Sequence, residues 1–546
     1  MNVMKDIRLW GILILALAVR TAMLFSVSAD IERAKTPDSQ EYENLAAGWL
    51  QTGEYEDPLP IKRIYFSGCL PRVYRAEIFR TPGYPALLAG AVRATPKNQS
   101  AQSPLLLLWF SARPSQTTYQ IILSFQVLVD LHLVMLTFFL GRSLAGHGAG
   151  LLAALFQAVS PLAAAASCRI LTDGIFAFML TAAVLLLLRH FRTGGWWLLL
   201  SAGLVMGAAC YVRPVGLAFS AVMALVILFS RRSTGILPVS SMAVPALPGK
   251  DKTTGGTPVE LTAETAVLLM GEPEGPGTPM LRRSARPRRL IRTAAFACIV
   301  IACIAPWVFR NATVADYWGF SSFATESMYW YSAAEIEARQ KHKPVEEIRQ
   351  QFRKAERWPD GTEEGLVAFA KGPCGSTPGH LARYRWDKAR GIILAHPWEF
   401  LDIHLRGDLA FWLPDATEAL EVLGYTSGGK GTLDVLHRQG LVAAAKHYFG
   451  DNRTAMALAG VMVVLLLVRY AGVVLCGLWR LRRRMTAAGW LCLLLVLTAW
   501  LLPGPANHPR FRVPVEPILS AAAAIGWLGL LQWRRRRRGA NKTVEQ

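Results

Sequence analysis

The chain has 546 residues, of which 52% are hydrophobic and 18% are charged, and its formal net charge is +21. The apolar residues form long runs, and a run of about 18 or more such residues can cross a bilayer as a helix, so the composition excludes an ordinary soluble enzyme. The positive charge lies in short clusters beside these runs, which indicates membrane topology rather than binding to nucleic acid.

The apolar runs predict an all-α polytopic membrane protein with about ten transmembrane helices. The first run follows Lys5 and Arg8 and is longer than the apolar region of a typical signal peptide, so we interpret it as a retained first helix. The predicted spans are residues 9–28, 118–140, 148–166, 174–189, 196–212, 214–230, 293–309, 453–475, 486–503 and 513–533.

The basic clusters predict the orientation, because Lys and Arg are retained on the cytoplasmic side of short loops. With the N-terminus inside, every strongly basic short loop falls on one side, so we expect a bacterial inner-membrane protein with both termini cytoplasmic. Two large extracytoplasmic loops then form a small mixed external domain. The expected segments are a first helix in 1–28, an external loop in 29–117, helices two to six in 118–230, a cytoplasmic disordered insertion in 231–292, a seventh helix in 293–309, a large external loop in 310–452, helices eight to ten in 453–533 and a basic cytoplasmic tail in 534–546.

The first external loop opens with the sequence TPDSQEYENLAAGWLQTGEY, which begins at Thr36. Pro37-Asp38-Ser39 is typical of a turn and N-cap, and the residues that follow predict a short amphipathic helix on the membrane surface. Asp38 would then lie at a helix N-terminus just above the lipid. Its alternative role is simply to cap that helix.

Further short motifs follow in order along the chain. They are the Arg-x-Pro-Gly-Tyr-Pro turn at 80–85, Leu-Thr-Asp-Gly at 171–174, Tyr-Val-Arg-Pro at 211–214, Ala-Pro-Trp-x-x-Arg-Asn at 305–311, His-Pro-Trp-Glu-Phe at 396–400 and Arg-Phe-Arg-Val-Pro-Val-Glu-Pro at 510–517. Together with the Asp38 element, this ordered set resembles the GT-C superfamily of membrane glycosyltransferases. More narrowly, it looks like the bacterial branch related to protein O-mannosyltransferases and lipid A aminoarabinose transferases.

The resemblance implies transfer of a sugar from a polyprenyl-phosphate donor to an acceptor lipid, glycan or protein at the outer membrane face. It implies that Asp38 is the family's first-loop aspartate, acting as general base or orienting the acceptor. Partial desolvation at the membrane surface predicts a raised proton affinity for this carboxylate. Asp173 is the second catalytic candidate, and its alternative role is to cap the fourth span. Glu77 and Glu41 are further acidic candidates.

The donor phosphate needs cationic partners, and arginine presents several donors in a rigid fork. Under the predicted topology several arginines lie at the external face, where each could equally bind a lipid headgroup. Arg510 and Arg512 flank Phe511, so at most one of them faces the site if this segment is extended. The predicted substrate-binding and phosphate-binding residues are Arg80, Tyr84, Arg213, Arg310, Arg510, Arg512, Glu77 and His508, with Arg169 as a further arginine at this face.

The sequence implies no definite cofactor. Paired carboxylates near a phosphate can hold a divalent metal, but no ligand spacing requires one. Cys69 and Cys374 would be able to form a disulfide if the two external loops meet. Aromatic residues of the large loop could stack on sugars or pack in a core, namely Trp318, Tyr329, Trp330, Tyr331 and Trp386.

Two other classes of membrane protein remain as alternatives. A transporter or flippase for lipid-linked glycans would also be polytopic, but it would often show two similar halves with charges near the bilayer midplane. An O-antigen-type polymerase or ligase would also use lipid-linked substrates. That class usually lacks an extended first external loop with an acidic motif, so the position of Asp38 favours the transferase.

Overall fold

The computed structural model describes residues 6–56, 76–95, 115–230, 279–356, 377–414, 416–425, 432–450, 452–481 and 485–544. Over these ranges the regular structure is helical, and β-pairing is limited to one isolated antiparallel bridge between Glu56 and Ala76. The predicted all-α fold is therefore confirmed for this part of the chain, whereas the small mixed external domain stays a prediction. The cysteine pair and residues 231–278 of the predicted disordered insertion lie outside the described residues. The rest of that segment, 279–292, was wrongly expected to be disordered, because it forms the first part of helix α11 (Pro279–Ala315).

Six helices of the described chain are long and apolar enough to cross a membrane. They are α1 (Ile7–Ala29), α4 (Gln116–Ala145), α7 (Asp173–Thr193), α11 (Pro279–Ala315), α20 (Arg453–Leu481) and α22 (Glu516–Val544). A seventh candidate is a pair of helices bent by 61°, α5 (His147–Ala158) and α6 (Pro161–Ser167). Three apolar helices are shorter, α8 (Trp196–Val212), α9 (Gly216–Phe229) and α21 (Ala487–Leu501). All ten predicted spans overlap these helices, whereas the number of crossings stays a prediction.

The remaining helices belong mainly to the two predicted external loops. The first loop contributes η2 (Ile31–Ala34), α2 (Pro37–Thr52) and α3 (Gly83–Ala94). The second contributes α12 (Phe323–Ser327), η5 (Met328–Ala333), α13 (Ala334–Lys341), α14 (Val345–Ala355), α16 (Pro378–Ala395), α17 (Pro397–Asp408), η6 (Leu409–Trp412), α18 (Ala416–Val422) and α19 (Thr432–Phe449). The segment before α22 forms η7 (Gly504–Ala506) and η8 (Pro509–Val515).

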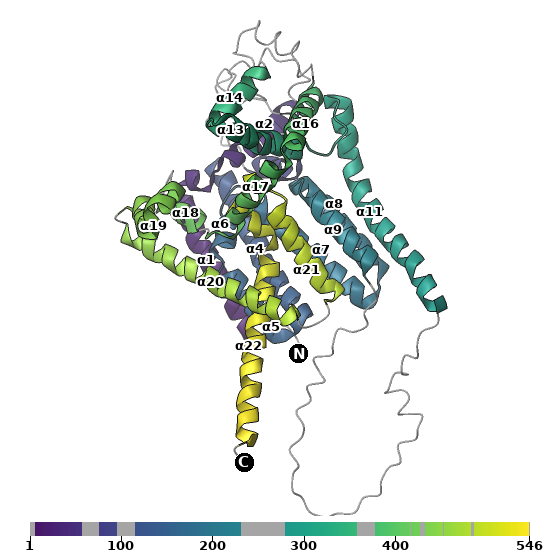
Figure 1. The fold of residues 1–546 in the computed structure, drawn as a ribbon, viewed down its shortest axis with the longest axis vertical. Coiled ribbons are helices and arrows are strands. Elements are labelled where there is room, and N and C mark those ends of the chain that lie inside the picture. Colours follow the sequence, from purple (N-terminus) through teal and green to yellow (C-terminus); the bar gives the residue numbers. More distant parts are fainter. Residues whose placement is uncertain are drawn as a thin grey trace, which may run out of the picture.

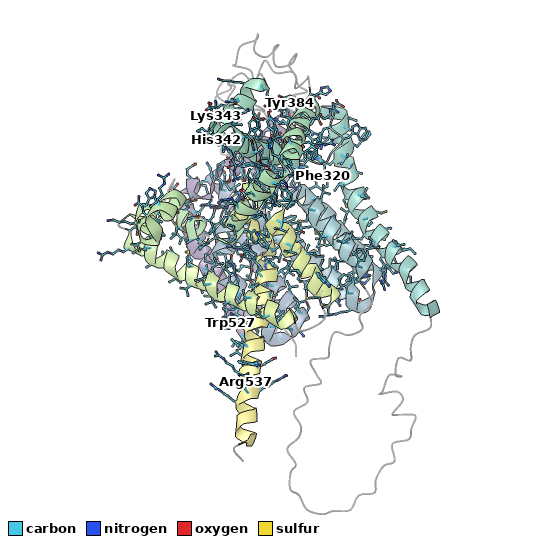
Figure 2. All side chains as sticks on the ribbon, viewed as in Figure 1. Phe320, His342, Lys343, Tyr384, Trp527 and Arg537 are labelled. Atoms are coloured by element: carbon cyan, nitrogen blue, oxygen red, sulfur yellow. The ribbon has the colours of Figure 1, made fainter. Side chains whose placement is uncertain are left out.

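The two ends of the molecule are formed by different parts of the chain. Helices α2, α13, α14 and α16 gather at one end of the long helices, and both chain termini lie at the other (Figure 1). Figure 2 shows Arg537 on the protruding C-terminal part of α22, far from His342 and Lys343 in the turn between α13 and α14. These described parts of the two predicted external loops therefore lie together, at the end opposite Arg537.

The long helices pack closely around a large apolar core. Side chains of α7, α8, α9, α11, α21 and α22 form its main cluster, in which Phe176, Met206 and Phe296 are fully buried. Helices α20 and α22 cross at glycines, because a Cβ added to Gly526 would lie 1.9 Å from the carbonyl oxygen of Gly472. A side chain at either crossing position would force the two helices apart.

Two buried ionic clusters join the long helices. Arg20 of α1 donates from Nε to Asp130 of α4 at 2.7 Å, and both side chains are almost fully buried. Glu516 at the start of α22 accepts hydrogen bonds from Arg469 of α20 and, at 2.8 Å, from Arg512 of η8. Buried charges are stable only when paired in this way, so these clusters fix the relative positions of the helices that contribute them.

Candidate active site

Asp38 lies in the first turn of α2, and the way that helix begins determines where its carboxylate points. Thr36 is the N-cap, because its side chain accepts a hydrogen bond from the Ser39 amide while the Ser39 hydroxyl accepts one from the Thr36 amide. Pro37 occupies the first helical position, which suits its fixed φ angle. The interpretation of Asp38 as the helix cap is therefore wrong, and its carboxylate is engaged in tertiary contacts instead.

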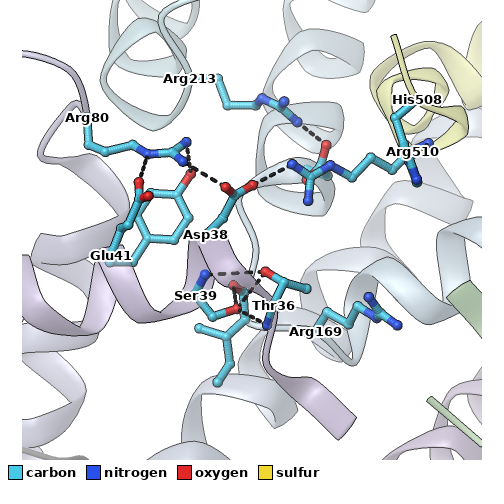
Figure 3. A network of polar contacts seen from close by, with 12 residues as sticks. Thr36, Asp38, Ser39, Glu41, Arg80, Arg169, Arg213, His508 and Arg510 are labelled. Atoms are coloured by element: carbon cyan, nitrogen blue, oxygen red, sulfur yellow. Dashed lines mark hydrogen bonds and ion pairs between the residues drawn. The ribbon is translucent and has the colours of Figure 1, made fainter. Parts of the chain in front are cut away.

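Two arginines hold the Asp38 carboxylate (Figure 3). Arg80 donates from Nη2 to Oδ1 at 2.8 Å, and Arg510 donates to Oδ2. The Nε of Arg80 also donates to Glu41 Oε2 at 2.7 Å, so this arginine bridges two carboxylates of α2. Glu77 fixes the turn that carries Arg80 by accepting a hydrogen bond from the Arg80 amide at 2.7 Å.

A second ion pair, between Asp173 and Arg213, joins the ends of two long helices near Asp38. Arg213, the residue that ends α8, donates to the Asp173 carboxylate. Thr172 precedes α7 as its N-cap residue, so the alternative reading of Asp173 as the cap is also wrong. Gly83 lets the start of α3 approach this region, since an added Cβ would lie 2.6 Å from the Tyr211 carbonyl oxygen.

These charged groups line one cavity of about 740 Å³. It is bounded by the start of α2, the Arg80 turn, the ends of α7 and α8, η8, α18 and the outer helices α12 and α14. Asp38, Arg80, Asp173, Arg213 and Arg510 all line this cavity, and each of them is a candidate site residue from the sequence.

The cavity also holds a cluster that sequence reasoning largely missed. Arg169 pairs with Glu418 at 2.5 Å and with Glu421 at 2.6 Å, and His508 Nε2 lies 4.0 Å from Glu418. The two glutamates lie on α18, in the part of the large loop that matches no motif. Their three-residue spacing on a helix is the one signal that they share a face, and it is too common to indicate a site.

Four predicted substrate-binding residues do not line this cavity, and one of them is Glu77, which fixes the Arg80 turn. Tyr84 is buried and donates to Gln126 Oε1 at 2.7 Å. Arg310 donates to the carbonyl oxygens of Glu77 and Tyr55 at 2.6 and 2.5 Å. Arg512 belongs to the buried cluster of Glu516. These three side chains support the fold as the structure places them, and Arg510 is the member of the Arg510/Arg512 pair that faces the cavity.

The ion pairs determine the protonation of the candidate base. Burial alone would raise the pKa of Asp38, but the guanidinium groups of Arg80 and Arg510 outweigh it and lower this pKa to about 2. The expectation of a raised proton affinity for Asp38 is therefore wrong for the ligand-free site. Burial and the nearby Arg510 and Arg169 lower the pKa of His508 to about 4, so this imidazole is neutral at neutral pH.

The described residues contain no group of three or more His, Cys, Asp or Glu side chains placed to hold a metal ion. The polar groups that line the cavity are mainly carboxylates, guanidinium groups and the imidazole of His508. Such a set can bind a phosphate, orient a hydroxyl or amine and accept a proton.

Comparison with known proteins finds a family model that matches part of the chain. Residues 103–244 match the family model described as dolichyl-phosphate-mannose-protein mannosyltransferase. Over this part of the chain, the match supports the resemblance to GT-C superfamily membrane glycosyltransferases. No curated protein sequence matches the chain.

Solved structures with a similar course of the chain come from two kinds of transferase. The oligosaccharyltransferase AglB from Archaeoglobus fulgidus, in complex with an inhibitory peptide and a dolichol-phosphate, has a TM-score of 0.45 at 12% identity, covering 100% of this chain and 52% of that one. ArnT from Cupriavidus metallidurans bound to undecaprenyl phosphate has a TM-score of 0.34 at 13% identity, covering 94% of this chain and 78% of that one. This chain thus spans about half the length of the archaeal enzyme.

Proposed function

We propose that this protein transfers a sugar from a polyprenyl-phosphate donor to an acceptor on the extracytoplasmic side of a bacterial inner membrane. The observation that carries the proposal is the convergence of Asp38, Arg80, Asp173, Arg213 and Arg510 on one cavity, from segments spread over nearly the whole chain. The cavity lies between the long apolar helices and the outer helices, where a lipid-linked donor and a water-borne acceptor group would meet.

The proposed topology has ten crossings with both termini cytoplasmic. It counts the six long helices, the bent pair and the three shorter apolar helices as one crossing each. The basic end of α22 lies opposite the outer helices (Figure 2), which agrees with retention of arginine on the cytoplasmic side. The cavity then opens on the outer side.

The donor phosphate would bind by exchange of ion pairs. Each described arginine that lines the cavity already has a carboxylate partner. Arg510 is the arginine best placed to change partner, because Asp38 would keep its ion pair with Arg80 when Arg510 leaves. When Arg510 turns to the phosphate, Asp38 loses one of the two cations that lower its pKa, and its carboxylate becomes a better proton acceptor.

The transfer step then needs few further groups. The acceptor oxygen or nitrogen bonds to the anomeric carbon, the bond from that carbon to the phosphate oxygen breaks, and its electron pair leaves on the polyprenyl phosphate. Asp38 takes the acceptor proton, and Arg510 with Arg80 stabilises the charge on the leaving phosphate. The Asp173–Arg213 pair would orient the acceptor or sugar beside them.

The experiment is transfer of radiolabelled sugar from a panel of polyprenyl-phosphate sugars in membranes that contain the wild type or Asp38→Asn. Asp402→Asn is the matched control, because Asp402 also pairs with an arginine but lies on α17 outside the cavity. Transfer that is lost only in Asp38→Asn supports both the activity and the base. Unchanged transfer in Asp38→Asn would reject the base, and movement of donor across the membrane without transfer would favour a flippase.

A further inference from the structure

The outer end of the cavity is built by η5 and α14 and differs from the end around Asp38. Four side chains matter there: Trp330 and Tyr331 of η5, and Arg349 and Arg353 of α14. We call these four residues the outer ledge. No step of the proposed transfer uses them.

A buried ring stack and two hydrogen bonds fix the outer ledge in place. Tyr329, which precedes it, is fully buried and stacks on Phe352 with ring centroids 4.7 Å apart. The indole of Trp330 donates to Glu326 at 3.0 Å, and Arg349 Nε donates to the Trp330 carbonyl oxygen, also at 3.0 Å. A network of this kind fixes both an aromatic ring and a guanidinium group before any ligand arrives.

The backbone of η5 is unusual as well. It forms a π-helix between α12 and α13. Such turns are rare and frequently lie at functional sites, because the wider turn alters which side chains share a face. Here it brings consecutive aromatic residues to the cavity wall, and Tyr331 keeps 45% of its surface exposed.

The two arginines of the outer ledge are oriented but weakly neutralised. Arg349 lies over the Tyr331 ring at 5.4 Å and Arg353 over the Trp330 ring at 5.7 Å. Both share the carboxylate of Glu346, at 3.7 and 3.8 Å, and that carboxylate is 58% exposed. Charge-assisted hydrogen bonds are about 2.7–2.9 Å long, so these pairs are loose and an incoming anion can replace Glu346.

We propose that the outer ledge binds an anionic group of the acceptor, a phosphate or a carboxylate, with a neighbouring ring of the acceptor stacked on Tyr331. Arg349 and Arg353 supply the forked donors, and the exposed Tyr331 supplies the flat apolar face. This inference rests on the proposed function, because it leaves the end around Asp38 to the donor phosphate.

The test is calorimetric binding to the purified full-length chain in lipid nanodiscs saturated with undecaprenyl phosphate, so that the Asp38 end is filled. The probes are glucose 1-phosphate, glucuronic acid and uncharged glucose. The wild type should bind at least one charged sugar at least tenfold more tightly than glucose. The double variant Arg349→Gln/Arg353→Gln should lose that preference, and Tyr331→Ala should weaken all binding. A phosphate ligand and a carboxylate ligand are distinguished by which charged probe binds.

Arg339→Gln is the matched control, because Arg339 has similar exposure but lies on α13 outside the cavity. It should bind like the wild type, and thermal unfolding should show that every variant is folded. Wild-type binding without preference for a charged probe would overturn the inference. Loss of undecaprenyl phosphate binding in the double variant would also overturn it, by assigning these arginines to the donor. Failure of the wild type to bind undecaprenyl phosphate would instead count against the proposed function.

Discussion

Replacing Asp38 with Asn should separate donor binding from sugar transfer. The substitution keeps the shape of the side chain and removes the charge that neutralises Arg510 and part of the charge that neutralises Arg80. Because the donor phosphate is proposed to compete with Asp38 for Arg510, the variant should bind polyprenyl phosphate more tightly than the wild type. It should also transfer no sugar, because the proton acceptor is gone.

The size of this change in donor affinity follows from the pKa of Asp38. Its pKa falls from the ordinary value of 3.8 to about 2, and this difference corresponds to about 2.4 kcal/mol of net favourable interaction in the charged state. If phosphate binding must give up that interaction in the wild type, its removal improves affinity by up to roughly 50-fold. The Asp38 side chain is 22% exposed, so solvent screens only part of the interaction.

The assay is binding of undecaprenyl phosphate to the purified protein in nanodiscs at pH 7, together with transfer measured on the same preparations. Asp402→Asn should match the wild type in both measurements. Equal or weaker binding by Asp38→Asn would refute the exchange of ion pairs, whatever happens to transfer. Tighter binding with transfer retained would support the exchange of ion pairs and reject Asp38 as the base.

Three further predictions concern folding and pH, and thermal unfolding in mild detergent measures all of them. Gly526→Ala should lower stability by about 1–3 kcal/mol because its methyl group meets the backbone of α20, whereas Gly477→Ala, with no atom within 4 Å of the added Cβ, should not. Glu516→Gln should cost about 3–5 kcal/mol because it leaves Arg512 buried beside a neutral group, and a loss below 1 kcal/mol would contradict the buried ion cluster. The folded-state pKa of His508, about 4, lies below its ordinary value of 6.5 because burial and the nearby arginines disfavour the charged imidazole. Stability should therefore fall as the pH falls from 6.5 to 4, and His508→Gln should remove that part of the pH dependence.

The long helices were predictable because the signal for each lies within its own residues. A run of apolar residues is sufficient to mark a span, and every predicted span overlaps a helix. The break between α5 and α6 was not predicted. Ser160 and Pro161 mark it, since proline favours the first position of a new helix and serine caps it.

The start of α2 shows how a local prediction failed by two positions. Threonine and aspartate are both good N-cap residues, and from the sequence Asp38 was considered as the cap. Pro37 distinguishes them, because proline at the first helical position requires the cap to be the residue before it. This correction matters for function, since a capping aspartate would have had its carboxylate engaged by its own helix.

The charge state of the site was not predictable from local sequence. The two arginines that lower the pKa of Asp38 are 42 and 472 residues away along the chain. The sequence indicates that such arginines lie on the same side of the membrane, but not that they share one carboxylate. Desolvation was therefore expected to determine the pKa of Asp38, whereas the two guanidinium groups determine it.

The pairing of charges in the cavity gives the proposed site a means of selecting its donor. A free phosphate would have to displace Asp38 from Arg510 and would gain little else, because the ion pair that breaks is about as favourable as the one that forms. A polyprenyl phosphate would make the same exchange and would also bury its chain against apolar helix surface, at about 0.8 kcal/mol for each CH₂ group removed from water. For a chain already dissolved in the bilayer that gain is small, so the membrane contributes chiefly by concentrating the donor at the cavity. The weak affinity of the neutralised site for free phosphate would then select the lipid-linked form. Asp38→Asn should lose part of this selectivity, because it should bind free phosphate as well.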